Sequence, residues 1–200
     1  MNADVLLDAH RFWCGELASK EHFPADKAPL WFERRDETDA AIRARFGAAL
    51  DEVATTAWDI EALARQAQIG LVIFLDQFPR NIFREDGRAF AYDARARAVA
   101  RALVAGGVRR FCLIERAFLY LPFEHSEDIV DQARWVRLYA ELLAEVPPAQ
   151  VEIYRDYLLF AEKHRDLIRR FGRFPHRNAA LGRESTAEET LFLSEHGRGY

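Results

Sequence analysis

Apolar side chains in this 200-residue chain recur at helical spacing almost from end to end, and this periodicity most restricts the fold. Strand-like alternation never persists, and glycine is sparse, at 10 residues. Apolar residues at positions i, i+3, i+4 and i+7 predict amphipathic helices. We therefore expect an all-α fold.

The strongest helix is expected over residues 59–78, since its second half is apolar on all sides and should therefore be buried on all sides. Proline disfavours helical geometry, so Pro79 should end this helix and Pro122 should end another. Further helices are expected over residues 2–14, 36–53, 93–105, 109–121, 126–145 and 151–171, and from residue 186. Short turns make successive helices antiparallel neighbours, which predicts either a bundle or a tetratricopeptide-like stack of about seven to eight helices, without a regular 34-residue repeat.

Composition favours one packed domain over residues 1–200, with residues 1–58 as a separate helical layer as the alternative. Half of the residues are apolar and 12% are aromatic, which suffices for a core without disulfides or metal. The net charge of −4 argues against a general nucleic-acid binder. Cys14 and Cys112 lie in apolar surroundings and are expected to be small buried hydrophobes.

No segment is long and apolar enough to predict a membrane span, which needs about 20 residues. The N-terminus also lacks the basic region of a signal peptide. We therefore expect a cytoplasmic protein without membrane contact. The sequence indicates no cofactor and leaves the oligomeric state open.

Three segments, residues 75–84, 120–128 and 170–178, carry the unusual polar residues. Each contains phenylalanine and proline, and each places charged or imidazole groups beside large aromatic rings. Each also lies where an apolar helix is expected to break. We expect the three segments to converge at one end or groove of the helical domain as a polar site.

Asp76 is the most informative residue of the first segment, because it lies inside an apolar run. A buried carboxylate without a partner costs several kcal/mol or takes up a proton. Arginine is the expected partner, since its planar fork can bind both carboxylate oxygens. A structural ion pair and a catalytic role are both compatible with this position.

His125 and His176 are the candidate acid–base residues of the other two segments. His125 adjoins Glu124 and an expected helix start capped by Ser126, so its acidic neighbours also suit a helix N-terminus. No spacing typical of metal ligands accompanies it. Two flanking arginines should lower the pKa of His176 and favour the neutral ring.

Six arginines lie between residues 165 and 183 against a single acid, Asp166, which indicates an anionic partner or pairing with acids elsewhere. The leading hypothesis is a small anionic ligand, such as a metabolite, and a peptide is the partner expected under the first alternative below. The alternatives are a tetratricopeptide-like protein-interaction scaffold whose motifs are structural, and a metal-dependent enzyme. The candidate catalytic residues are Asp76, His125 and His176. The candidate ligand-binding residues are Arg80, Asn81, Glu124, Arg173, Arg177 and Asn178, and no metal ligand is assigned.

The motifs at residues 76–81, 121–127 and 170–178 resemble those of the domain of unknown function 924 family. The aromatic pairs at residues 12–13 and 31–32, and the stretch at residues 181–186, fit the same resemblance. It covers nearly the whole chain and implies a tetratricopeptide-like, all-α fold in a bacterial cytoplasmic protein. It implies no activity.

Overall fold

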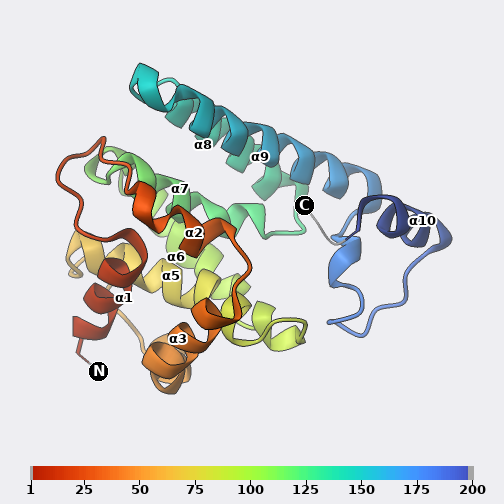
Figure 1. The fold of residues 1–200 in the computed structure, drawn as a ribbon, viewed down its shortest axis with the longest axis horizontal. Helices are drawn as coiled ribbons and strands as arrows, with labels where there is room; N and C mark the ends of the chain where they lie inside the picture. The colour runs from red at the N-terminus through yellow and green to blue at the C-terminus, as the bar shows by residue number, and fades with distance from the viewer. Residues whose placement is uncertain (1, 198–200) are drawn as a thin grey trace. The chain divides into compact units, whose positions relative to one another are not determined.

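The computed structural model describes residues 2–197 and contains no strand among them (Figure 1). The all-α prediction is confirmed. Two compact units divide the chain, one of Met1–Arg84 with Arg88–Pro122 and the other of Glu85–Gly87 with Phe123–Tyr200. The single domain and the tetratricopeptide-like arrangement stay predictions.

The helices follow one another with short connections. The α-helices are α1 (Asp4–Cys14), α2 (Ala28–Phe32), α3 (Asp36–Phe46), α4 (Leu50–Thr55), α5 (Arg65–Ile82), α6 (Asp93–Ala105), α7 (Leu113–Glu124), α8 (Ile129–Leu143), α9 (Val151–Phe171) and α10 (Ala187–His196). The 3₁₀ helices are η1 (Ala25–Lys27), η2 (Gly47–Ala49), η3 (Gly87–Phe90), η4 (Val108–Arg110), η5 (Pro148–Gln150) and η6 (Pro175–Arg177).

Helix α5 is the central helix of the first unit, as its apolar run predicts. Every residue from 67 to 76 is buried, and α1, α3, α4 and α6 all pack against the helix. Phe74 and Phe78 meet Phe46 of α3, whose ring stacks on Phe78 at 4.6 Å between centroids. The hydrophobic core of this unit is therefore built around α5.

The predicted ends of α5 are wrong, because the helix begins at Arg65 and continues through Pro79 to Ile82. A proline inside a helix costs about 3 kcal/mol, since it removes a hydrogen bond and clashes with the preceding turn. The turn after the proline is held by polar contacts to neighbouring helices. Arg80 pairs with Asp93 of α6, and Arg84 pairs with Asp39 of α3. These contacts stabilise the turn and act against the cost of the proline.

Helix α7 likewise continues through Pro122 to Glu124, so the prediction that it ends before the proline is wrong. The expected cap of the next helix is also wrong, because Asp128 rather than Ser126 caps α8 by accepting from the Val130 N–H. The predicted helix over residues 36–53 is divided into α3, η2 and α4 at a glycine, Gly47.

In the second unit, α8 and α9 run side by side as a helical hairpin (Figure 1). Helix α9 ends at Gly172, whose left-handed φ of 70° suits a residue without Cβ. Helix α10 begins with the predicted capping box, in which Thr186 and Glu189 each accept the backbone N–H of the other. The predicted start of α10 is therefore confirmed.

Candidate functional site

The first segment lies in the first unit, at the C-terminal half of α5. Asp76 is fully buried, and its carboxylate accepts from Gln77 Nε2 at 2.6 Å. Arg80 lies one turn later, with Nη1 3.6 Å from Asp76 Oδ1. Its guanidinium also donates to both carboxylate oxygens of Asp93, at 2.9 and 3.0 Å. Arg80 therefore joins α5 to the first turn of α6.

Asn81 has a similar role toward α3. Its Nδ2 donates to Asp39 Oδ1 at 2.8 Å, and Arg84 donates to both oxygens of the same carboxylate. The hydrogen bonds from Arg84 and Asn81 outweigh the effect of burial and lower the pKa of Asp39. The polar residues of the first segment thus bind α5 to two neighbouring helices.

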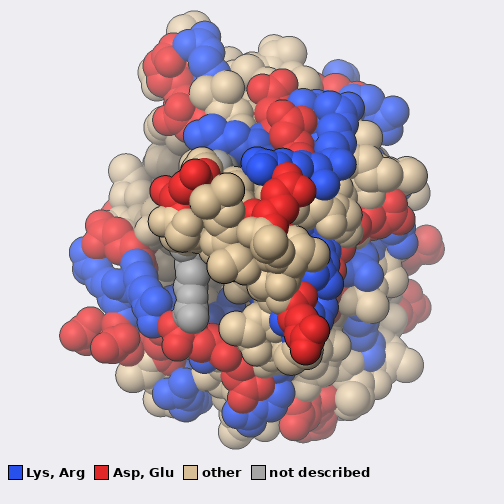
Figure 2. Space-filling model, turned by 90° about the vertical axis from the view of Figure 1, so that its right-hand side faces the viewer, with Lys and Arg blue, Asp and Glu red and all other residues tan. Residues whose placement is uncertain are grey.

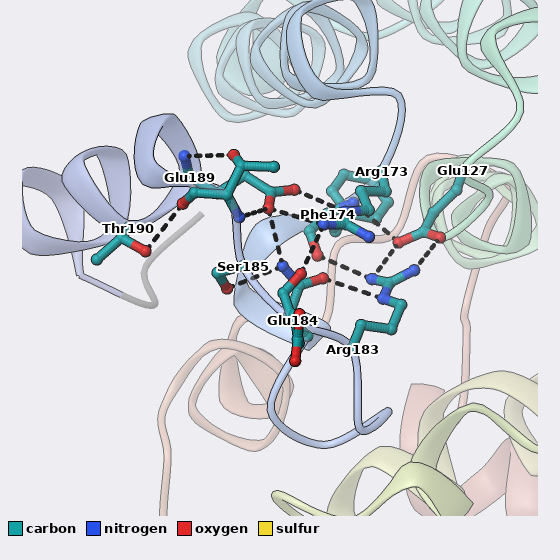
Figure 3. Close-up of polar contacts among 10 residues, drawn as sticks. Glu127, Arg173, Phe174, Arg183, Glu184, Ser185, Glu189 and Thr190 are labelled. Carbon is teal, nitrogen blue, oxygen red and sulfur yellow. Dashed lines mark hydrogen bonds and ion pairs between the residues drawn. The ribbon is translucent and has the colours of Figure 1, made fainter.

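Arg173 and Glu189 form a two-pronged ion pair in the second unit (Figure 3). The guanidinium donates to the two carboxylate oxygens at 2.6 and 2.8 Å, and also to the Glu184 carbonyl at 2.9 Å. The hydrogen bond from Arg173 lowers the pKa of Glu189 to about 2. Because the same carboxylate completes the α10 capping box, this pair joins the end of α9 to the start of α10.

Glu127 receives a second two-pronged contact, from Arg183, at 2.7 and 2.9 Å (Figure 3). It also accepts the Phe174 N–H at 2.8 Å, while Arg183 donates to the Phe174 carbonyl. Asn178 accepts from Arg183 Nε and donates to Ser185 Oγ, both at 3.0 Å. The second and third segments are therefore brought together by hydrogen-bonded charges.

These ion pairs change the interpretation of the arginines that the sequence predicts to bind an anion. Arg80 and Arg173, two of the three predicted anion-binding arginines, make two-pronged contacts with carboxylates of the same unit. Basic and acidic side chains also alternate over the face drawn in Figure 2. Pairing with acids, the alternative interpretation of the arginine excess, therefore accounts for these two residues.

A second group of polar residues lies around the ring of Phe174, and it contains imidazoles instead of carboxylates. The rings of His164 and His176 lie 5.6 and 5.5 Å from it between centroids. The guanidinium carbon of Arg177 stands 4.6 Å above it, and Arg177 Nη1 donates to the His125 carbonyl at 2.9 Å. We call His125, His164, His176 and Arg177 the imidazole cluster.

His164 is the buried member of the imidazole cluster, with 5% of its surface exposed. Its Nδ1 lies 3.0 Å from the Phe160 carbonyl, which can only accept, so Nδ1 carries the proton. Nε2 faces Glu124 Oε1 at 3.4 Å. Burial, with Arg177 and His125 adding to it, lowers the pKa of His164 to about 4. The ring is neutral at pH 7.

His176 differs from His164 in its hydrogen bonding. Among residues 2–197 its ring nitrogens have no hydrogen-bond partner, although the side chain is half-buried against Phe174. Burial lowers its pKa to about 4, with further lowering by Arg177, His164 and His125 and an opposing effect of Glu127. The predicted lowering by Arg177 agrees with this finding, whereas Arg173 is engaged by Glu189.

The predicted site residues are thus divided between the two units. Asp76, Arg80 and Asn81 belong to the first unit. The second unit brings together His125, Glu124, His176, Arg177 and their neighbours Arg173 and Asn178. Convergence of all three segments, and catalysis by Asp76 with the two histidines, stay hypotheses.

Two features of the structure were not predicted from the sequence. Gln132 of α8 donates its Nε2 to the carbonyls of Phe123, Glu124 and Ser126, and so holds the turn that carries His125. The position of Gln132 on an otherwise apolar helix face is the sequence feature that could have predicted these hydrogen bonds.

The second unpredicted feature is a buried polar cluster in the first unit. Glu115 is fully buried and is bound by His10 Nε2 at 2.7 Å, Arg65 Nη1 at 2.8 Å and the Cys112 N–H at 2.7 Å. Burial raises the pKa values of Cys14 and Cys112, so both thiols are protonated at pH 7. The predicted burial of the cysteines is confirmed. The position of Glu115 just after an apolar stretch is the sequence feature that could have predicted this cluster.

Two absences within the described part of the chain bear on the remaining hypotheses. No group of three or more His, Cys, Asp or Glu residues within residues 2–197 has an arrangement that could hold a metal ion. No helix within the same residues has the length and apolar character of a membrane span.

Comparison with known proteins gives a family and a fold. A family model described as a bacterial protein of unknown function (DUF924) matches residues 9–197. The solved structure of a protein of unknown function, ATU0120 from Agrobacterium tumefaciens, is similar at 34% identity with a TM-score of 0.75. The similarity covers 96% of this chain and 97% of that one. No curated protein matches the chain.

Proposed function

The chain belongs to the bacterial DUF924 family, whose function is unknown, and we propose that its second unit binds a small oxyanion through His176. Arg177 and His125 would lie beside the bound anion. A carboxylate and a phosphate are the two chemical classes that fit, since each offers several acceptor oxygens to imidazole and guanidinium donors. The proposal keeps three of the predicted site residues, His125, His176 and Arg177, and gives Arg80 and Arg173 no part in anion binding.

The observation that carries the proposal is the unpartnered ring of His176. The ring nitrogens of His176 are not among the fully buried polar atoms that lack a partner, so they are accessible from solvent and open to a ligand. The ring lies against Phe174 and next to a buried guanidinium. An oxyanion would supply the acceptor that the described residues do not.

The charges around His176 favour a negative ligand. Burial disfavours the protonated form of the ring most, and the charged guanidinium of Arg177 adds to this effect, whereas Glu127 acts in the opposite direction. The charge of Glu127 is largely compensated, because Arg183 binds both of its oxygens. The electrostatic potential at the ring is therefore positive, as an anion site requires.

A thermal-shift titration with sulfate, phosphate and acetate, at constant ionic strength, tests the proposal. A ligand at 100 times its Kd stabilises the folded state by about 2.7 kcal/mol, or about 5–10 °C for a chain of this size. The wild type should show a saturable shift with at least one anion. His176→Asn should lose it, and His196→Asn, a matched histidine on α10, should retain it.

A non-saturable shift, equal in the wild type and both variants, would refute the proposal. Sulfate and phosphate stabilise most proteins weakly by exclusion from their surface, and such an effect would not depend on His176. The control variant therefore separates site binding from the general salt effect.

Exposed apolar side chains on α9 favour a second candidate, a peptide-binding surface. Leu159 and Phe160 are 47% and 48% exposed on this helix. The test uses a peptide selected from a library for binding the wild type. This peptide should bind the Leu159→Glu variant more weakly than the wild type. It should keep its affinity for Leu191→Glu, which changes an exposed leucine on α10. Equal binding to both variants would reject this surface.

A further inference from the structure

Resting on the proposed function, we infer that His176 takes up a proton when the oxyanion binds, so that the occupied site holds an imidazolium–anion pair. The preferred ligand is then an oxyanion that is fully ionised and brings no proton of its own. Affinity should rise as the pH falls. The inference adds the charge state of the site to the proposed ligand class.

Among the described residues, the groups that act on the pKa of His176 include Arg177, His164, His125 and Glu127, and Arg183 compensates the one acid of these four. Arg177 follows it in η6, and His164 reaches the same phenylalanine ring from α9. His125 and Glu127 belong to the turn before α8. The carboxylate of Glu127 is occupied by Arg183 and by the Phe174 N–H.

Glu124 is the remaining acid near the imidazole cluster, and its Oε1 lies 3.4 Å from His164 Nε2. Among the described residues no carboxylate makes an ion pair or hydrogen bond with the ring of His176, so a bound anion would provide a counterion for its protonated form.

Linkage sets the size of the effect. The pKa of His176 lies at about 4 in place of its ordinary 6.5. An anion in contact favours the charged ring and raises this pKa. If anion binding restores the pKa of His176 to its ordinary value, the pKa rises by about 2.5 units. The proton then tightens anion binding, and the anion tightens proton binding, by the same factor of roughly 300. Between the two pKa values, the Kd should fall by up to about tenfold for each unit by which the pH is lowered.

Isothermal titration calorimetry with sulfate measures this coupling. Sulfate stays a dianion from pH 5 to pH 8, so any proton taken up belongs to the protein. Titrations at pH 5.5 and 7.5, in two buffers of different ionisation enthalpy and equal ionic strength, give the number of protons bound per sulfate. We expect an uptake near one proton at pH 5.5, a smaller uptake at pH 7.5 and tighter binding at the lower pH.

Sulfate binding without proton uptake at either pH would overturn the inference and leave the proposed function intact. Absence of saturable binding of any oxyanion would instead refute the proposed function itself. His176→Asn should abolish the proton uptake, whereas His196→Asn should leave it unchanged.

A direct measurement on the wild type avoids dependence on a folded variant. The pKa of His176, followed by the nitrogen chemical shifts of its labelled ring, should rise by at least one unit when sulfate saturates the site. The ring nitrogen chemical shifts of His196 serve as the internal control and should not respond to sulfate. An unchanged His176 pKa in the presence of bound sulfate would contradict proton uptake at this ring.

Discussion

Replacing Gly70 with alanine tests the packing of α1 against α5. A Cβ at this position would lie 1.9 Å from the Leu6 carbonyl oxygen and 2.7 Å from its carbonyl carbon. Ordinary contacts of a Cβ begin at 3.4 Å. The atoms in the way belong to the backbone of α1, so no side-chain rotation can relieve the overlap. The two helices must separate.

The magnitude follows from that separation, which is about 1.5 Å if the overlap is fully relieved. A gap of 0.5–1 Å already forfeits a quarter to a half of the dispersion energy of the contacts across it. Helix α1 contributes Leu6, Ala9 and Trp13 to this buried face. Overpacking of this kind costs about 3 kcal/mol, against a gain of about 1 kcal/mol from the helix propensity of alanine. We expect a net loss of about 2 kcal/mol or more.

Urea unfolding followed by circular dichroism measures the free energy of unfolding. Gly47→Ala is the matched control, because a Cβ at Gly47 would lie no closer than 3.6 Å to its nearest neighbour, Arg43 Cγ, and the φ of this glycine is −59°. The control should be neutral or slightly stabilising. A Gly70→Ala variant as stable as the wild type would refute close packing of α1 on α5.

Three further predictions concern the polar contacts. Asp39→Asn should lower the free energy of unfolding by about 2 kcal/mol in urea titrations, because it weakens the charged hydrogen bonds of a part-buried ion pair with Arg84. Thr186→Ala should cost about 1 kcal/mol, the usual value of a lost helix cap, and an unchanged midpoint would contradict the α10 capping box. Acidification from pH 7 to pH 5 should lower the free energy of unfolding by about 2 kcal/mol through His164. The pKa of His164 is about 4 in the folded protein and 6.5 in the unfolded chain, so the unfolded chain takes up the proton at a higher pH. His164→Gln should lose that part of the pH dependence, and an identical pH profile would contradict it.

The helical elements could be predicted from the sequence because their signals are local. The apolar run of α5, the glycine after α9 and the Thr186–Glu189 spacing each specify a helix or its end within a few residues. The error at Pro79 has a non-local cause. The contacts that hold the turn after it join α5 to α3 and α6, and local proline chemistry contains no information about them.

The residue types of the candidate site could be predicted from the sequence, but the partners in its ion pairs could be predicted less well. A buried Asp76 with an arginine partner follows from the cost of an unpaired carboxylate, and Arg80 meets that need. The partner of Arg173 does not follow from any such rule. Glu189 is sixteen positions away, and its own spacing to Thr186 indicated only a helix cap. The same carboxylate performs both functions.

The charge pairs and the imidazole cluster are electrostatically connected, although they use different residues. Arg183 lies outside the three segments singled out in the sequence, yet it binds both oxygens of Glu127. Glu127 raises the pKa of His176. Because Arg183 compensates this carboxylate, the positive charge of Arg177 prevails at the ring. An ion pair whose direct role is to join two segments thus also sets the potential that a bound anion would meet.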